Sequence, residues 1–147
     1  MRTEQLFDKM ELTELTNKLF MYCDARQWQL LQDEVFTSSI WFDVESGGAG
    51  KPLMMETGDV CKMWSEGFIG LDGVHHQAGH YLITVKEDAA DIYGYAVATH
   101  YKKDALKGQT RTFTGSYDLK AQRGSNGWRL TQFKYNLKYL TGNLTME

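Results

Sequence analysis

The sequence has few cysteines and no arrangement of them that supports redox chemistry. Cys23 and Cys61 are its two cysteines, and they lie far apart without CxxC spacing. We therefore expect two reduced thiols in a reducing compartment rather than a disulfide-stabilised secreted fold. Cys23 also lies at an apolar position of a predicted helix, where a cysteine is more often part of the core than a nucleophile.

Two classes of partner have no support in the charge and hydropathy of the chain. The net charge is −3, and the lysines and arginines are scattered rather than gathered in the basic stripe that nucleic-acid binding requires. No apolar run approaches the roughly 18 residues of a membrane span. The N-terminal sequence MRTEQLFDKMELTEL carries acidic residues where a signal peptide needs an apolar region. We expect a cytoplasmic protein that binds neither nucleic acid nor membrane.

Proline is almost absent as well, because Pro52 is the only one among 147 residues. No Pro/Ser-rich or charged stretch divides the chain, and 42% of the residues are hydrophobic, which is enough to build a core. A chain of this length predicts one compact domain over residues 1–147, in which residues 1–10 are a candidate flexible start.

The hydrophobic pattern changes from helical to strand-like along the chain. Apolar residues at three- and four-residue spacing predict helices over 12–24, 25–33 and 57–70. Runs of β-branched and aromatic residues predict strands over 35–44, 75–85, 89–101, 112–122 and 128–139. The glycine-rich segment SGGAGKP after the first strand is a predicted loop. This order indicates an α+β fold, in which a strongly curved, mostly antiparallel sheet packs on three N-terminal helices.

The predicted strand over 89–101 has one face of small residues. Alternation gives this face Ala96, Ala98 and His100, and it gives the other face Tyr95 and Tyr101. A cavity beside the sheet would use small side chains to leave space and a histidine to meet a ligand. Close packing of a helix on the small face, with His100 at a solvated strand end, explains the pattern equally well.

Histidines cluster in the segment VHHQAGH. His76 and His80 have the four-residue spacing of zinc ligands on a helix, but Gly79 and the β-branched residues that follow predict a strand. On a strand the two histidines share a face, unless a bulge at Gly79 changes the register. We therefore predict no metal and no other cofactor.

Four segments, in this order along the chain, resemble the SnoaL-like branch of the nuclear transport factor 2-like superfamily. They are YCDARQW (22–28), VHHQAGH (74–80), ADIYGYAVATHY (90–101) and NGWRL (126–130). The resemblance covers nearly the whole chain and implies a cone-shaped α+β barrel, whose curved sheet and helices enclose a deep pocket. The superfamily contains enzymes and non-enzymes, so the fold alone does not assign a function.

Within this superfamily the chain is similar to scytalone dehydratase at three functional positions. The similarity implies acid–base roles for Asp24, His76 and His100. A carboxylate bonded to one imidazole nitrogen fixes the tautomer and leaves the other nitrogen free to take a proton, so Asp24 would orient His76 or His100. From its position between two predicted helices, Asp24 also fits a helix cap.

The chain departs from scytalone dehydratase at the two tyrosines that bind and polarise the substrate carbonyl. Cys23 and Val44 stand at the matching positions. Tyr22, Trp41 and Tyr117 are the candidates to replace them.

The resemblance implies a small cofactor-free lyase or isomerase that acts on a hydrophobic cyclic, polyketide-like or steroid-like molecule. The predicted substrate-binding residues are Tyr22, Trp41, Val44, Met63, Phe113 and Tyr117. The alternatives are a binding domain of the same fold without turnover and a scaffold subunit whose pocket is filled by its own side chains. A stripe of Tyr93, Tyr95 and Tyr101 is the candidate interface of a homodimer or homotrimer.

Overall fold

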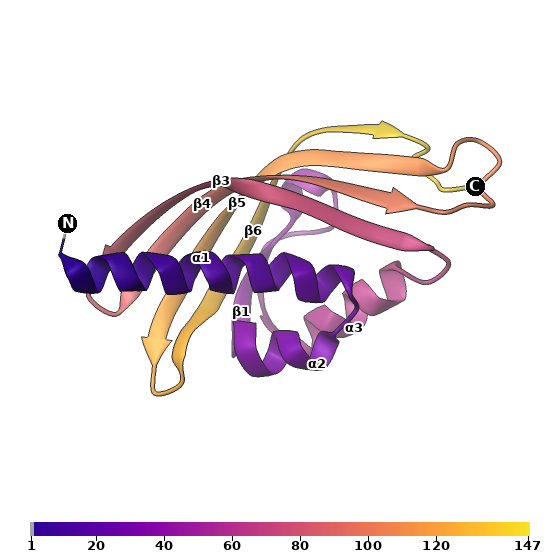
Figure 1. The fold of residues 1–147 in the computed structure, drawn as a ribbon. Coiled ribbons are helices and arrows are strands. Elements are labelled where there is room, and N and C mark those ends of the chain that lie inside the picture. The colour runs from indigo at the N-terminus through magenta and orange to yellow at the C-terminus, as the bar shows by residue number, and fades with distance from the viewer. Residues whose placement is uncertain (1) are drawn as a thin grey trace.

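The computed structural model describes residues 2–147, which form three α-helices and a six-stranded sheet (Figure 1). In chain order the elements are α1 (Thr3–Asp24), α2 (Trp28–Leu30), a π-helical turn η1 (Leu31–Val35), β1 (Phe36–Asp43), a 3₁₀ turn η2 (Glu45–Gly47), β2 (Leu53–Glu56), α3 (Thr57–Gly67), β3 (Gly73–Lys86), β4 (Ala89–Tyr101), β5 (Thr110–Gly124) and β6 (Gly127–Gly142).

The sheet is curved and almost entirely antiparallel. Its strand order is β2-β1-β6-β5-β4-β3, and β1 with β6 is the parallel pair. Figure 1 shows the long strands arching over α1, while α2 and α3 lie below the other part of the sheet. The predicted α+β class and the curved sheet are thus confirmed. The sheet does not close into a barrel, because β2 and β3 remain as its two edges.

The first helix begins much earlier than the apolar stripe predicts. Residues 1–10 were the candidate flexible start. Met1 lies outside the described residues, and the chain is helical from Thr3 onward. Asp8 anchors this part of α1, because its Oδ1 accepts hydrogen bonds from Trp128 Nε1 at 3.2 Å and Arg123 Nη1 at 2.5 Å. No helix among residues 2–147 is long and apolar enough to cross a membrane.

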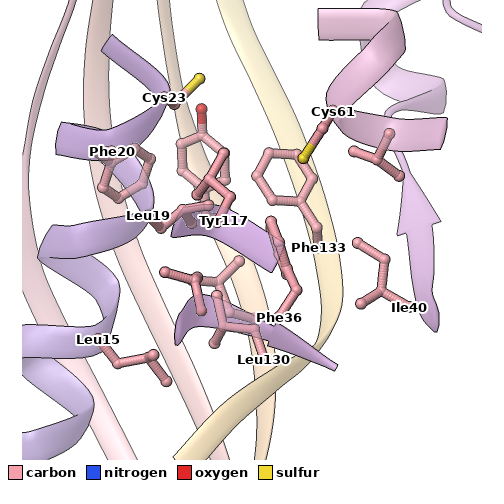
Figure 2. Close-up of a cluster of buried hydrophobic side chains, with 14 of the residues drawn as sticks. Leu15, Leu19, Phe20, Cys23, Phe36, Ile40, Cys61, Tyr117, Leu130 and Phe133 are labelled. Atoms are coloured by element: carbon pink, nitrogen blue, oxygen red, sulfur yellow. The ribbon is translucent and has the colours of Figure 1, made fainter. Parts of the chain in front are cut away.

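The main core lies between α1 and the concave face of the sheet. Leu15, Leu19 and Phe20 of α1 are buried there. Figure 2 shows Leu19 and Phe20 next to Tyr117 of β5, with Phe133 of β6 on the other side of Tyr117 and Leu15 further along the helix. The Phe20 and Tyr117 rings meet edge to face with centroids 5.1 Å apart, a geometry that aromatic pairs favour. This core fixes the end of α1 against the strands.

The region between α1 and α3 differs from the prediction at two elements. The predicted helix over 25–33 begins only at Trp28 and continues as the π-helical turn, because Arg26 has a positive φ of 57° that interrupts the helix. β2 was not predicted. It pairs with β1 through Ile40 and Met55, but it is a short edge strand with mostly exposed side chains, so no alternation marks it in the sequence.

β4 has the two faces that its alternation predicts. Ala96, Ala98 and His100 are buried on the concave side, and Tyr95 and Tyr101 are exposed on the convex side. The small face serves two purposes along its length. At Gly94 the Tyr81 ring lies so close that an added Cβ would come within 2.6 Å of Tyr81 Cδ1, so this part is closely packed. The part around Ala98 borders a cavity.

A bulge in β3 separates the clustered histidines. The register of β3 with β4 shifts between Gly79 and Leu82, and His80 adopts a positive φ of 57°. The His80 ring therefore lies beside Tyr95 on the convex side, with ring centroids 5.6 Å apart. Simple alternation would have put His76 and His80 on one face, and the bulge overturns this.

Candidate active site

A cavity of about 430 Å³ lies between the end of α1, α3 and the concave face of the sheet. This volume is in the lower part of the range of small-molecule sites, roughly 300–1,000 Å³. Its wall is mostly apolar and includes the aromatic rings of Phe20, Trp64, Phe68, Phe113 and Phe133. A ligand of matching shape is therefore compact and largely apolar.

Asp24 and His76 form a hydrogen-bonded pair at the end of α1. Asp24 Oδ1 lies 2.6 Å from His76 Nδ1, and Asp24 Oδ2 accepts the backbone N–H of His76 at 2.8 Å. Because a carboxylate accepts, the Nδ1 proton of His76 points to Asp24 and Nε2 is left to take a proton. His76 is part of the cavity wall, and Asp24 lies behind it. The helix-cap interpretation of Asp24 fails, since Gln27 precedes α2 and no side chain caps that helix.

His100 takes its orientation from Arg111 rather than from Asp24. The register of β4 with β5 sets the two residues opposite each other, and Arg111 Nε donates a hydrogen bond to His100 Nδ1 at 3.0 Å. A guanidinium has no acceptor, so the proton of neutral His100 sits on Nε2. Burial, followed by the nearby charge of Arg111, lowers the pKa of His100 to about 4. His100 is therefore a neutral N–H donor near pH 7.

The two imidazoles share the cavity from neighbouring strands. His76 is paired with Ala98, and His100 follows two residues after Ala98 on the same face of β4. Such diagonal neighbours have Cα atoms about 7–8 Å apart. Both side chains line the cavity, with small Ala98 leaving space next to them. The arrangement offers a proton acceptor and a hydrogen-bond donor to one ligand.

The predicted substrate-binding residues divide into two groups. Val44, Met63, Phe113 and Tyr117 line the cavity. Tyr22 lies elsewhere, because its hydroxyl donates to Glu34 Oε2 at 2.7 Å.

Trp41 lies on the other face of β1 from the buried Ile40 and Phe42, with 39% of its surface exposed. The expectation that Tyr22 or Trp41 lies beside a ligand in this cavity is therefore corrected.

The two positions predicted to match tyrosines of scytalone dehydratase, Cys23 and Val44, both line the cavity. They give it apolar surface there, without a hydroxyl group. Two other hydroxyl groups are present, from Tyr117 and Tyr135. In Figure 2 the Tyr117 hydroxyl is directed toward Cys23. Burial raises the pKa of both tyrosines, that of Tyr135 to about 12, so both keep their protons.

The sequence did not identify Arg111 and Tyr135 as site residues. Tyr135 of β6 is paired with Tyr117 of β5, and Arg111 of β5 is paired with His100 of β4. The signal for Arg111 was the register of the β4–β5 hairpin, but the predicted strand began at residue 112, just after it. Without an exact register, no pattern separates Arg111 from other surface arginines.

The metal interpretation of the histidine cluster has no geometric support. His76 faces the cavity, whereas His80 lies beside Tyr95 on the convex side. Within residues 2–147, no group of three or more histidine, cysteine, aspartate or glutamate side chains gathers where it could hold a metal ion.

Comparison with known proteins identifies the family. The sequence matches the SnoaL-like domain over residues 4–134. The structure of Kfla4162 from Kribbella flavida is similar, with 24% identity, a TM-score of 0.89 and coverage of 94% of this chain and 95% of that chain. A proposed scytalone dehydratase from Novosphingobium aromaticivorans has 12% identity and a TM-score of 0.80, over 97% of this chain and 92% of that chain.

A hexachlorocyclohexane dehydrochlorinase from Novosphingobium barchaimii has 14% identity and a TM-score of 0.77, over 95% of this chain and 92% of that chain. No curated protein matches the sequence. At these identities the solved structures establish a shared fold, and the sequence match establishes the family. The chain belongs to the SnoaL-like domain family, as its motifs indicated.

Proposed function

We propose that this protein is a cofactor-free lyase or isomerase that acts on a compact hydrophobic cyclic molecule. The observation that carries the proposal is the Asp24–His76 pair on the wall of an apolar cavity, beside neutral His100. Two proteins of the same fold are named for eliminations, a dehydration and a dehydrochlorination. Fold similarity alone does not assign a reaction, and the side chains of the cavity are what favour this one.

His76 is the proton-transfer group. Its Nε2 takes a proton from a carbon next to a ring carbonyl, and the imidazolium that forms is stabilised by the Asp24 carboxylate. In an elimination the C–O bond on the neighbouring carbon then breaks, and the departing hydroxide takes the proton from His76 to leave as water. In an isomerisation the same proton returns to a different carbon. Both routes restore neutral His76 without a cofactor.

His100 stabilises the negative charge that develops on the carbonyl oxygen. Its Nε2–H donates a hydrogen bond, and the charge of Arg111 behind it strengthens that bond. This role needs a neutral imidazole, which the lowered pKa of His100 supplies. The two histidines thus have different roles. Asp24 makes His76 a proton acceptor, and Arg111 makes His100 a hydrogen-bond donor.

The substrate differs from scytalone in the polar groups that it meets. Cys23 and Val44 offer no hydroxyl group, while Tyr117 and Tyr135 offer two from the sheet side of the cavity. An oxygen substituent that enters an apolar part of the cavity loses its hydrogen bonds to water without replacement, which weakens binding. We therefore propose ligands with fewer oxygen substituents at the Cys23 end of the cavity.

Exchange of carbon-bound protons tests the proposal without knowledge of the substrate. Cyclohexanone and α-tetralone are incubated with the protein in deuterium oxide, and loss of the α-proton signals is followed by NMR. We expect exchange above the buffer rate that is abolished in His76→Asn and kept in His80→Asn. His80 is the matched control because it lies outside the cavity, and asparagine tolerates its positive φ. Ketone binding without exchange would contradict the proposed chemistry.

Ligand binding without turnover is the second candidate. The observation that favours it is the apolar surface at Cys23 and Val44, which leaves this part of the cavity with few polar groups. A scaffold role has less support, because its cavity would be filled by side chains and this one keeps about 430 Å³. In a binding domain, His76→Asn and wild type would bind α-tetralone alike and neither would exchange its protons.

A further inference from the structure

Arg111 has hydrogen-bonding capacity that the protein does not use. Its Nε donates to His100 Nδ1, and its Nη1 donates to the backbone oxygen of Leu144, both at 3.0 Å. Both acceptors are neutral. Within residues 2–147 no carboxylate lies within 4.0 Å of this guanidinium, and Nη2 has no acceptor. Arg123, by contrast, pairs with Asp8 and Asp88.

The surroundings of Arg111 favour an anion. Arg111 is part of the cavity wall, and the part of the chain that the structure describes adds no aspartate or glutamate to that wall. Burial lowers the pKa of Arg111, which means that its positive charge is partly desolvated without a counter-charge. An anionic group at the guanidinium would offset that cost through a charge-assisted hydrogen bond.

A second arginine lies just outside this end of the cavity, behind the Phe68 ring. Arg26 lies with its guanidinium carbon 5.9 Å from the centre of the Phe68 ring, and that ring meets His100 edge to face at 5.5 Å. Its guanidinium donates a hydrogen bond to the backbone oxygen of Leu71 rather than to a carboxylate. Asp24 brings one negative charge to the site, behind His76, against the two positive charges of Arg26 and Arg111.

We propose that the ligand of this cavity is a cyclic compound bearing a carboxylate, which Arg111 binds through its free Nη hydrogens. The fork of a guanidinium matches the two oxygens of a carboxylate, which gives orientation as well as affinity. The ring attached to that carboxylate lies over Ala98, between His76 and Phe113. These two residues are the partners of Ala98 on the neighbouring strands β3 and β5. This inference names the substrate class of the proposed function and rests on that function for the reaction.

Calorimetric titration with two matched ligands tests the inference. β-Naphthoate and β-naphthamide have nearly the same shape, but only the first is charged at neutral pH. We expect wild type to bind the carboxylate at least about tenfold more tightly than the amide, a difference that a charge-assisted bidentate contact supplies. A ratio near one in wild type would overturn the inference, whatever any variant does.

Variants then assign the preference to Arg111. Arg111→Gln removes the charge but keeps an amide donor for His100, and we expect the ratio to fall to about one with the affinity for naphthamide unchanged. Arg129→Met is the matched control, because Arg129 donates to the backbone oxygens of Trp128 and Asp33 outside the cavity wall. A full preference in Arg111→Gln would overturn the assignment.

The ketone exchange assay keeps this inference separate from the proposed function. α-Tetralone is neutral, so its His76-dependent exchange does not need Arg111 to bind an anion. Exchange without a preference for naphthoate would leave the lyase or isomerase proposal standing and overturn the carboxylate inference. A preference for naphthoate without exchange would support an acid-binding cavity and contradict the reaction.

Discussion

The two imidazoles of the cavity have different hydrogen-bond partners, and this difference decides what each can do. A carboxylate holds the Nδ1 proton of His76, whereas a guanidinium donates to Nδ1 of His100. The first arrangement leaves Nε2 as an acceptor, and the second leaves Nε2–H as a donor. The cavity thus contains an acceptor and a donor from the same residue type.

The tautomers can be observed directly. We expect nitrogen-15 NMR spectra of the imidazoles at neutral pH to show His76 protonated at Nδ1 and His100 protonated at Nε2. The Asp24→Asn variant should alter the His76 pattern and spare that of His100, because Asp24 bonds to His76 while His100 takes its hydrogen bond from Arg111. The same tautomer at both histidines in wild type would contradict the division of roles.

His100 should also make the stability depend on pH. Its imidazole takes a proton below about pH 6.5 in the unfolded chain but only below about pH 4 in the folded protein. The unfolded state binds more protons between these values, so the free energy of unfolding falls as the pH falls from 6.5 to 4. The contribution is at most about 3 kcal/mol. Urea denaturation of wild type and His100→Gln at several pH values measures it, and parallel profiles would contradict the assigned burial.

The sequence identified some site residues and missed others for physical reasons. Asp24, His76 and His100 carry a family resemblance, but Asp24 equally fitted a helix cap until its contact with β3 was known. Tyr22 and Trp41 were misjudged because a rotation of the helix or a one-residue change in the strand decides which side an aromatic ring faces. The place of Arg111 beside His100 depends on the pairing of two strands, and no single segment of the sequence specifies that pairing.

Gly115 marks a point where two strands come too close for a side chain. It lies at the register shift between β5 and β6, and an added Cβ would clash with the backbone oxygen of Asn136 and lie 2.8 Å from Tyr135 Cζ. We expect Gly115→Ala to lower the free energy of unfolding by about 1–3 kcal/mol, as overpacked sites do.

Gly124→Ala is the matched control for this substitution. Gly124 ends β5 with nothing within 4 Å of its added Cβ and no positive φ. Its effect should stay within about 0.5 kcal/mol. Equal urea midpoints for the two variants would mean that the close approach of β5 and β6 is absent in solution.

The individual helices and long strands were predictable, but their arrangement was not. Period-two alternation marked β4, and a three- to four-residue repeat marked the buried face of α1. The parallel pairing of β1 with β6 joins Phe42 to Phe133 across most of the chain, and β2 is too short to carry a pattern. The sequence allowed a bulge at Gly79 as the exception to simple alternation. The bulge is present, and it turns His80 to the opposite face of the sheet from His76.

The convex face of the whole molecule is the predicted assembly surface. Tyr95, Val97 and Tyr101 are exposed there, and Lys138 Nζ lies 3.9 Å from the centre of the Tyr95 ring. We propose that this face joins two or three copies, since aromatic side chains are enriched in such interfaces. Light scattering at working concentration should give the mass of a dimer or trimer, and Tyr95→Lys should lower it. A monomeric wild type would contradict the prediction.

The molecule as a whole encloses an apolar cavity and brings one carboxylate to the back of one histidine across 52 residues of chain. The measurement that tests this account most directly is the rate of α-tetralone proton exchange in Asp24→Asn relative to wild type. We expect a fall of about 10²–10⁴-fold with unchanged ketone affinity, because an amide cannot stabilise the imidazolium of His76. An exchange rate equal to that of wild type would show that Asp24 takes no part in proton transfer, and the account would be wrong.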